Sequence, residues 1–388
     1  MLHLAWRYIV FHKAKTAIVI ACVTLTAYLP VTAHLMVERL QRGLTARAEA
    51  TPLVIGAKGS RFDLALHALY FRDVPPEETS LAESHRVRDS GLAEPIPLFI
   101  RYTARKHPIV GTTLDYFEFR RMNIAEGQQM AILGDCVIGH RAAKKLEIKP
   151  GDHLLSDPEN LFDIAGSYPL RMKVTGILAP TFSADDDAIF VDMKTAWIIA
   201  GVGHGHQDLT KTNEPGVVLS QTDQKITASA AVVQFTEITD KNIDSFHFHG
   251  SPDQYPLTAL IALPHDRKSS TILEGRYLAP KLQTQIIDPE EVVNELMRVV
   301  FRVKRFFDLG ALVLLCVTLV LIVLVMMLAL RLRQREMETM FKLGCGQFTI
   351  FGLQAAELAI VIVIGLSLAA GLTAATLALA PRFLQVLA

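Results

Sequence analysis

The sequence lacks an excess of charge of either sign, since 39 Lys and Arg residues balance 39 Asp and Glu residues among its 388 positions. Proteins that bind nucleic acid usually carry a basic excess, so the composition does not favour a nucleic-acid partner. Cysteine is also scarce, and of the four cysteines only Cys136 lies in the long polar middle of the chain. No intrachain disulfide is therefore expected there, even in an oxidising compartment.

The sequence also lacks the motifs of common catalytic sites. Its nearest approach to a P-loop, Gly56-Ala57-Lys58-Gly59-Ser60, does not have the G-x-x-x-x-G-K-[ST] spacing that wraps phosphate. Ser60 does not lie in the sequence context of a nucleophile elbow either. We therefore expect that the chain is not an enzyme. Lys58, Gly59 and Ser60 are interpreted as a glycine-rich turn after a strand, with a partner-docking loop as the alternative.

Long apolar runs are present near both ends of the chain. A hydrocarbon core about 30 Å thick requires about 20 apolar residues in a helix, and three runs are long enough. They predict transmembrane helices at 16–37, 308–331 and 354–380. Buried helices of a soluble protein are the alternative, which uncharged runs of this length disfavour. The first run is too long for the apolar part of a signal peptide and precedes no small-x-small cleavage site, so we interpret it as a retained anchor.

Lysine and arginine residues predict the orientation in the membrane, because cytoplasmic flanks are enriched in them. Basic residues precede the first run and follow the second, namely Arg7, Lys13, Lys15, Arg331, Arg333, Arg335 and Lys342. The segments 1–15 and 332–352 are therefore expected in the cytoplasm, and 38–305 and the tail 381–388 outside it. In a Gram-negative cell the chain would be a multi-pass inner-membrane protein with its large domain in the periplasm.

The polar middle alternates between strand-like and helix-like patterns. Strands are predicted at 97–112, 170–178 and 254–264, and a helix at 265–277. The segments 135–148 and 187–200 each predict a strand that leads into a helix. The fold class is therefore an α-helical membrane protein with a large mixed α/β extracytoplasmic domain between the first and second transmembrane helices.

Two further segments complete this prediction. The pattern at 285–306 is helical, with Asp288 as its cap and Pro289 in its first turn, and we expect this helix to continue into the second span. The segment 203–230 is rich in Gly, His, Gln, Thr and Asp and has little periodicity. It is interpreted as an exposed loop or a poorly packed insert.

A short amphipathic helix is predicted between the second and third spans. Arg335 and Glu336 open it, its apolar side includes Met340 and Phe341, and Gly344 ends it. Such a helix would lie at the inner membrane face, with a solvated loop as the alternative.

This segment resembles the coupling segment of MacB/FtsX-like (type VII ABC) permeases. The matching positions are Arg333, Arg335, Glu336, Leu343, Gly344 and Glu357. The polar middle is similar to the periplasmic core domain of that family at Val110-Gly111-Thr112, Asp115-Tyr116-Phe117, Gly127, Val137-Ile138-Gly139, Leu146, Gly151-Asp152, Asp187-Ala188-Ile189-Phe190-Val191 and Thr195-Ala196. The resemblance covers nearly the whole chain and also places Asp185-Asp186-Asp187 in a turn that leads into a strand.

The resemblance implies a permease subunit that transmits the ATP-driven motion of a separate ATPase to the external domain, which moves or releases an extracytoplasmic cargo. It implies an ABC ATPase dimer that binds ATP and Mg²⁺, a second permease copy or a related permease, a periplasmic adaptor or binding protein, and membrane lipid as partners. The expected coupling residues are Arg333, Arg335, Glu336, Met340, Lys342 and Gly344. Most members of the family have a fourth span, so this chain resembles a shortened branch with three.

Two His-x-His pairs lie in the polar middle, His204 with His206 and His247 with His249. Alternate residues of a strand share a face, so each pair could bind one metal ion. Together with Asp208 or Asp253, the pairs could form a Zn²⁺ or Cu²⁺ site. Surface histidines without metal are the alternative. Similar permeases are associated with zinc-handling operons, so the resemblance also implies a metal-linked cargo.

Two functions other than transport are consistent with the resemblance. One is a transmembrane signal transducer that activates a periplasmic partner such as a cell-wall hydrolase. The other is a metal sensor whose ATPase responds to occupancy of the histidine pairs. A mixed α/β external domain does not by itself distinguish these functions.

Overall fold

The computed structural model describes the chain except for residues 1, 12, 73–76, 159–168, 207–217, 223–224, 229–234, 333, 335–337, 340–341, 343–345 and 388. The described residues form two compact units. Unit 1 contains Met1–Gly43 and Met297–Ala388, and unit 2 contains Leu44–Leu296.

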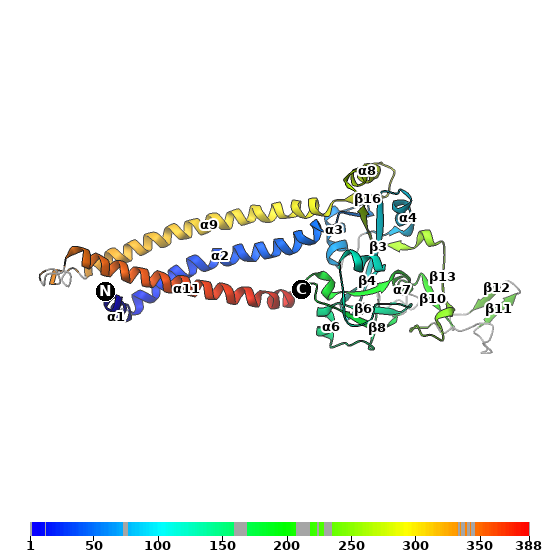
Figure 1. Ribbon diagram of the computed structural model, residues 1–388, viewed down its shortest axis with the longest axis horizontal. Helices are drawn as coiled ribbons and strands as arrows, with labels where there is room; N and C mark the ends of the chain where they lie inside the picture. The colour runs from blue at the N-terminus through cyan, green and yellow to red at the C-terminus, as the bar shows by residue number, and fades with distance from the viewer. Residues whose placement is uncertain are drawn as a thin grey trace. The chain divides into compact units, whose positions relative to one another are not determined.

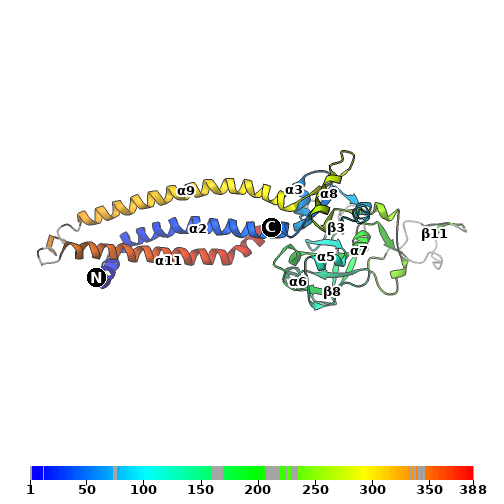
Figure 2. The same cartoon turned by 45° about the horizontal axis from the view of Figure 1, so that its top comes forward.

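Unit 1 is helical. Its elements are α1 (Leu2–Phe11), most of α2 (Lys13–Glu49), most of α9 (Pro289–Leu332) and α11 (Gln347–Leu387). The three long helices lie side by side in Figure 1 and Figure 2. Within the described residues, two segments are long and apolar enough to cross a membrane, Thr16–Arg39 and Ala355–Leu379, and Asp308–Leu324 is a shorter apolar stretch. The number of three spans therefore stays a prediction.

Hydroxyl groups join the long helices of unit 1. The Thr24 Oγ1 donates to the Gly365 carbonyl at 3.2 Å, and the Thr32 and Thr373 hydroxyls lie 3.0 Å apart. Thr32 lies eight residues after Thr24, and Thr373 lies eight residues after Gly365. Because both helices advance in the same direction from the first contact to the second, α2 and α11 run parallel. A Cβ atom at Gly365 would lie 2.8 Å from Val23 Cγ1, so this glycine permits the close approach of the two helices.

The parallel direction of α2 and α11 predicts where the C-terminus lies. If both helices cross the membrane, they cross it in the same direction, and the basic residues before α2 predict that this direction is outward. We expect a C-terminal alkaline phosphatase fusion to be active and a C-terminal cytoplasmic reporter to be inactive in the same cells. An inactive phosphatase beside a working cytoplasmic reporter would contradict this topology.

Unit 2 is a mixed α/β domain around a ten-stranded sheet with the order β16-β1-β15-β3-β4-β9-β6-β8-β5, in which β7 also pairs with β8. Most neighbours are antiparallel, but β4 with β9 and β6 with β8 are parallel. The strands are β1 (Leu53–Ala57), β3 (Ala93–Ala104), β4 (His107–Thr112), β5 (Ile124–Gly127), β6 (Asp135–Ile138), β7 (His153–Leu155), β8 (Arg171–Leu178), β9 (Ile189–Asp192), β15 (Ala259–Pro264) and β16 (Thr284–Ile287).

Helices and smaller strand pairs complete unit 2. The helices are α3 (Arg61–Tyr70), α4 (Leu81–Asp89), α5 (Leu114–Phe119), α6 (His140–Leu146), α7 (Met193–Ile199) and α8 (Arg267–Tyr277), with 3₁₀ turns η1 (Ala184–Asp187), η2 (Ile243–Ser245) and η3 (Pro252–Gln254). Three two-stranded pairs are β2 (Thr79–Ser80) with β14 (Pro256–Leu257), β10 (Gly203–Gly205) with β13 (Phe246–Phe248), and β11 (Val218–Thr222) with β12 (Lys225–Ala228).

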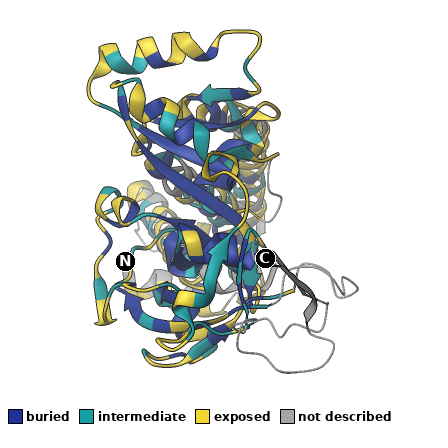
Figure 3. Ribbon diagram, turned by 90° about the vertical axis from the view of Figure 1, so that its right-hand side faces the viewer, coloured by how far each residue is buried: buried dark blue, intermediate teal, exposed yellow. Residues whose placement is uncertain are grey.

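The sheet supplies the core of unit 2, and Figure 3 shows its strands mostly in the dark blue of buried residues. One apolar cluster joins β6, β8 and β9 to α6 and α7, and a second joins β1 and β15 to α8. In β9, the apolar run Ile189, Phe190 and Val191 is completely buried, which agrees with a strand covered on both faces. The mixed α/β architecture predicted from the sequence is confirmed.

Two predictions about local structure need correction. Of the two interpretations of 203–230, the loop does not hold for the described residues, because they include β10, β11 and β12, and the poorly packed insert stays a prediction. Residues 285–287 are not the start of a helix but belong to the edge strand β16, which pairs with β1. The helix α9 begins only at Pro289, where Asp288 Oδ1 accepts a hydrogen bond from the Glu290 amide at 2.8 Å.

Gly139 and Gly275 form a matched pair for a test of this packing. A Cβ atom at Gly139 would lie 2.3 Å from the Asp185 carbonyl oxygen, whereas one at Gly275, inside α8, would meet nothing within 4 Å. We expect Gly139→Ala to destabilise unit 2 by about 1–3 kcal/mol. Gly275→Ala should instead stabilise it by up to about 1 kcal/mol, because alanine favours a helix. Thermal unfolding of the full chain in detergent would measure both changes, and a similar shift for both would contradict the packing at Gly139.

Candidate metal centre

The two His-x-His pairs lie on neighbouring strands of unit 2. β10 and β13 pair antiparallel, with His204 opposite His247, and the two strands lie side by side (Figure 1). His206 and His249 follow directly after these strands. The structure therefore brings together two histidine pairs that are far apart in the sequence.

The alternation of small and large residues places the histidines on one face of this ribbon. Gly203 pairs with Phe248 and Gly205 with Phe246. A Cβ atom at either glycine would lie within 2.7 Å of a ring atom of its partner phenylalanine, so the rings cover the glycines on one face. Since successive side chains of a strand point to opposite faces, the imidazoles share the other face.

The four imidazole rings form a compact cluster. Ring centroids lie 4.8 Å apart for His204 and His247, 4.8 Å for His204 and His249, and 5.0 Å for His206 and His247. Ligand nitrogens of His204, His206 and His247 all lie within 4.8 Å of one another. His204 and His206 are half-buried and His249 is exposed, so an ion from solution could reach the cluster.

Two of these rings, His204 and His247, have surroundings that favour metal binding. Burial lowers the pKa of His204, and the neighbouring His247, His249 and His206 lower it further, so this ring is neutral at pH 7. The His247 Nδ1 lies 3.1 Å from the Ser245 carbonyl oxygen, which can only accept a hydrogen bond. Nδ1 therefore carries the proton, and the lone pair of Nε2 is available to an ion.

The carboxylates named with the histidines do not join the cluster. Asp253 lies 2.9 Å from His85 Nδ1 and is absent from the group of ligand atoms around His204. Asp208 lies outside the described residues.

A cavity of about 770 Å³ adjoins the same ribbon. Phe246 and Phe248 of β13 line it together with Trp197, Met193 and Arg88. Phe248 and Phe246 are the residues that cover the glycine face, so β13 contributes phenylalanine rings to the cavity and histidines to the cluster. Ring contacts continue from Phe248 to Tyr255 at 6.0 Å and from Tyr255 to Trp197 at 4.9 Å between centroids.

A buried polar network anchors the C-terminal end of α2 to the rest of unit 2. Sequence patterns did not indicate this network. Arg47 donates two hydrogen bonds to Asp185, at 2.6 and 2.9 Å, and one to the Tyr116 hydroxyl at 2.8 Å. The exposed fractions are 7% for the Arg47 side chain and 2% for Asp185. Arg120 extends the network to Thr51, which lies just after α2, with a hydrogen bond of 2.8 Å.

The surroundings keep Asp185 ionised. Burial alone would raise the pKa of its carboxyl, but hydrogen bonds from Arg47, Ser183 and Tyr116 and the charge of Arg47 hold that pKa below its usual value. Burial raises the pKa of Tyr116 to about 12, so its phenol stays protonated and donates to Asp185 at 2.8 Å. The pair therefore has the geometry of a bidentate, hydrogen-bonded salt bridge.

The neighbouring aspartates also have partners, as expected for a turn that leads into a strand. Asp186 accepts from the Thr181 and Phe182 amides at 2.8 and 2.9 Å, and Asp187 pairs with Arg141. These residues form η1, directly before β9. The carboxylates of this turn therefore bind groups of the protein itself.

Lys58, Gly59 and Ser60 form the turn between β1 and α3, and all three are exposed. The Ser60 Oγ accepts from the Asp63 amide at 3.2 Å and caps α3. The turn has a structural role, and partner docking at it stays a prediction.

Most of the expected ATPase-coupling residues lie outside the described residues, namely Arg333, Arg335, Glu336, Met340 and Gly344. Lys342 is described, and it is exposed. The coupling role of the whole set therefore stays a prediction from the sequence.

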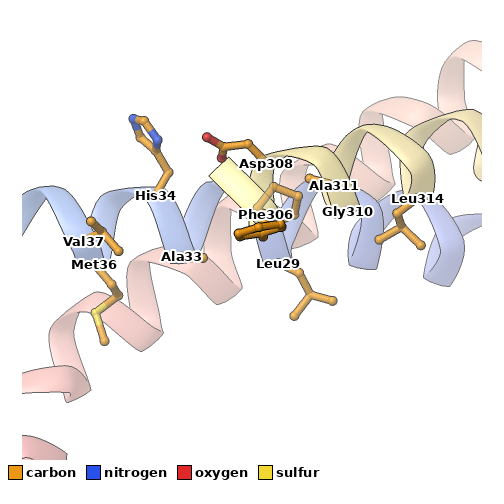
Figure 4. Close-up of a pocket in the computed structure, with 11 residues that line it drawn as sticks. Leu29, Ala33, His34, Met36, Val37, Phe306, Asp308, Gly310, Ala311 and Leu314 are labelled. Atoms are coloured by element: carbon orange, nitrogen blue, oxygen red, sulfur yellow. The ribbon is translucent and has the colours of Figure 1, made fainter. Parts of the chain in front are cut away.

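An apolar cavity of about 550 Å³ lies in unit 1 between α2 and α9 (Figure 4). Leu29, Phe306 and Leu314 line it, and the His34 and Asp308 side chains lie on the same side of it. Apart from His34 and Asp308, the residues that line this cavity are apolar.

A comparison with known protein families identifies the family of the chain. The sequence profile of the MacB-like periplasmic core domain matches residues 17–237, more than half of the chain. A comparison with curated protein sequences finds no match.

Solved structures show weaker likeness. The periplasmic region of MacB from Actinobacillus actinomycetemcomitans is 11% identical, with 66% of this chain and 95% of that chain covered and a TM-score of 0.36. The extracellular domain of the noncanonic ABC-type transporter YknZ from Gram-positive bacteria is 12% identical, with coverages of 61% and 98% and a TM-score of 0.33. These TM-scores are low, so the sequence profile carries the assignment.

Proposed function

Because this chain belongs to the family with a MacB-like periplasmic core domain, and is therefore a permease-type component of an ABC transporter, we propose that it transmits motion rather than forming a substrate tunnel. A separate ATPase supplies the motion, and the external domain uses it to move or release an extracytoplasmic cargo. The clustered ligand atoms of His204, His206 and His247 favour a metal-linked cargo.

One observation carries this proposal: α2 and α9 each contain residues of both units. α2 extends from Lys13 to Glu49, and α9 from Pro289 to Leu332. Backbone hydrogen bonds stiffen a helix, so a displacement at one end reaches the other. α9 has no proline after its first residue, whereas Pro30 removes one of these hydrogen bonds from α2. Arg47, near the end of α2, is bound to Asp185, so a displacement of α2 acts on the sheet domain through a buried salt bridge.

The family supports the proposed partners. ATP and Mg²⁺ bind to an ABC ATPase dimer at the cytoplasmic face, because a permease-type component of an ABC transporter works with such an ATPase. A second copy of this chain, or a related permease, completes the membrane part. A periplasmic adaptor or binding protein receives or delivers the cargo.

Purification of the tagged chain from its native membrane, followed by mass spectrometry, tests this function. An ABC ATPase together with a periplasmic binding or adaptor protein is the expected result. Recovery of a cell-wall hydrolase with the ATPase would replace transport by signal transduction. Recovery of the intact chain without any ATPase, under conditions that preserve a known ABC complex, would contradict the proposal.

A further inference from the structure

We propose that His204, His206 and His247 bind one divalent ion of the zinc class, with the neighbouring His249 ring as a fourth candidate ligand, and that this ion fixes the wall of the cavity on the other side of the ribbon. The inference concerns unit 2 alone. It does not require an ATPase partner, so its failure would be distinguishable from failure of the proposed function.

The ligand set determines the class of ion. Among the described residues, the candidate metal group contains histidines and no carboxylate. Calcium and magnesium prefer oxygen ligands, whereas neutral imidazole suits zinc, copper and nickel. The Ser245 carbonyl, which accepts from His247 Nδ1, provides the outer-shell contact that orients a metal-binding histidine.

Small rotations would bring the nitrogens to an ion. Zinc–nitrogen bonds are about 2.0–2.1 Å long, so a tetrahedral ion holds its nitrogens about 3.3 Å apart. In the structure the ligand nitrogens of His204, His206 and His247 lie within 4.8 Å of one another. Side-chain torsions can close this difference while the paired strands keep their register.

The ribbon itself needs support. β10 and β13 have three residues each, and a two-stranded ribbon of this size is marginally stable alone. An ion bound to histidines of both strands would cross-link them. The cross-link would restrict the intervening Phe248, whose ring lines the cavity and contacts Tyr255.

The fluorescence of Trp197 can report a change in the cavity wall. Its indole lines the cavity, is 5% exposed, contacts the Tyr255 ring and donates from Nε1 to the Pro256 carbonyl at 2.9 Å. Since the chain has two tryptophans, the Trp6→Phe variant leaves Trp197 as the sole fluorescent indole.

The experiment uses the full chain in detergent with the Trp6→Phe change, freed of metal by a chelator. Equilibrium dialysis against ZnCl₂, followed by elemental analysis, should give one zinc ion per chain, and MgCl₂ should not compete. The Trp197 emission should change with the same midpoint as zinc binding.

Variants identify the ligands. His204→Ala and His247→Ala should each weaken zinc binding by more than about 100-fold, the upper end of what loss of an outer-shell contact costs. His85→Ala is the matched control, because His85 lies in unit 2 with a side chain 44% exposed and pairs with Asp253. It should bind zinc with unchanged affinity. The metal-free melting temperature of each variant shows that unit 2 is folded.

Either half of the proposal can be overturned. Absence of stoichiometric zinc binding by the folded parent chain, or binding that survives both His204→Ala and His247→Ala, would remove the metal site. Zinc binding that leaves the Trp197 emission unchanged would remove the link between the ion and the cavity. If a ligand variant does not fold, native mass spectrometry of the parent chain with and without zinc decides the first point.

Discussion

Replacement of Arg47 by alanine should lower the free energy of unfolding of unit 2 by about 3–5 kcal/mol, the usual cost of removing one partner from a buried salt bridge. The variant leaves the Asp185 carboxylate, whose side chain is 2% exposed, without its bidentate partner. It also removes a hydrogen bond to the Tyr116 hydroxyl. Thermal or denaturant unfolding of the full chain in detergent, followed by tryptophan fluorescence, would measure the loss.

Arg61→Ala is the matched control for Arg47→Ala. Arg61 pairs with Glu295 at 3.0 Å, but the two side chains are 47% and 42% exposed. An exposed pair of this kind contributes at most about 1 kcal/mol. Similar losses for the two variants would show that the Arg47 network does not stabilise unit 2 as its burial implies.

The stabilisation by Arg47 should depend on pH with a definite sign. The folded-state pKa of Asp185 lies below its ordinary value of 3.8. The contribution of the pair is therefore present above pH 4 and is lost as the pH falls through the lower folded-state pKa. The difference between the parent chain and Arg47→Ala should narrow below about pH 4, and a difference that grows there would contradict the assignment.

Replacement of Arg335 and Glu336 together by alanine should abolish the stimulation of the partner ATPase in the assembled complex. The two residues open the predicted amphipathic helix between two spans, where a cytoplasmic ATPase would dock. Loss of both charges removes contacts that hydrogen-bonded ion pairs across an interface would supply. The measurement compares ATP hydrolysis by the ATPase alone, by the parent complex and by the variant complex.

Gln334→Ala is the matched control for this double variant, because Gln334 lies in the same segment but is uncharged and is not one of the residues that carry the resemblance. It should leave ATP hydrolysis unchanged. Co-purification of the ATPase with each variant separates loss of assembly from loss of stimulation. Unchanged hydrolysis by an assembled Arg335 and Glu336 variant would show that this segment does not couple the two subunits.

Local sequence patterns predicted the architecture because strand propensity and helix capping depend on residues that are close together in the sequence. The apolar and β-branched runs at β3, β4 and β8 predicted strands, and Asp288 with Pro289 predicted the first turn of a helix. Three of the four residues of β16, 285–287, were assigned to that helix, because a short edge strand beside a strong helical pattern has little signal of its own.

Long-range contacts were much less visible in the sequence. The spacing of His204 with His206, and of His247 with His249, identified two candidate metal-binding pairs. Gly alternates with His at 203–206, and Phe alternates with His at 246–249. These two patterns are the one available signal that β10 and β13 pair, and neither pattern by itself specifies its partner. Arg47 and Asp185 are 138 residues apart, and nothing in the sequence around either residue specifies a charged partner.

Hydrogen–deuterium exchange of the assembled complex tests most directly whether ATP-driven motion reaches unit 2. Exchange would be compared with ADP and with a non-hydrolysable ATP analogue. The account predicts that ATP changes the protection of residues 44–57 and 284–296, where α2 and α9 meet the sheet domain, as well as that of the cytoplasmic segment. A change confined to the cytoplasmic segment, with the ATPase bound and occupied, would contradict the transmission of motion.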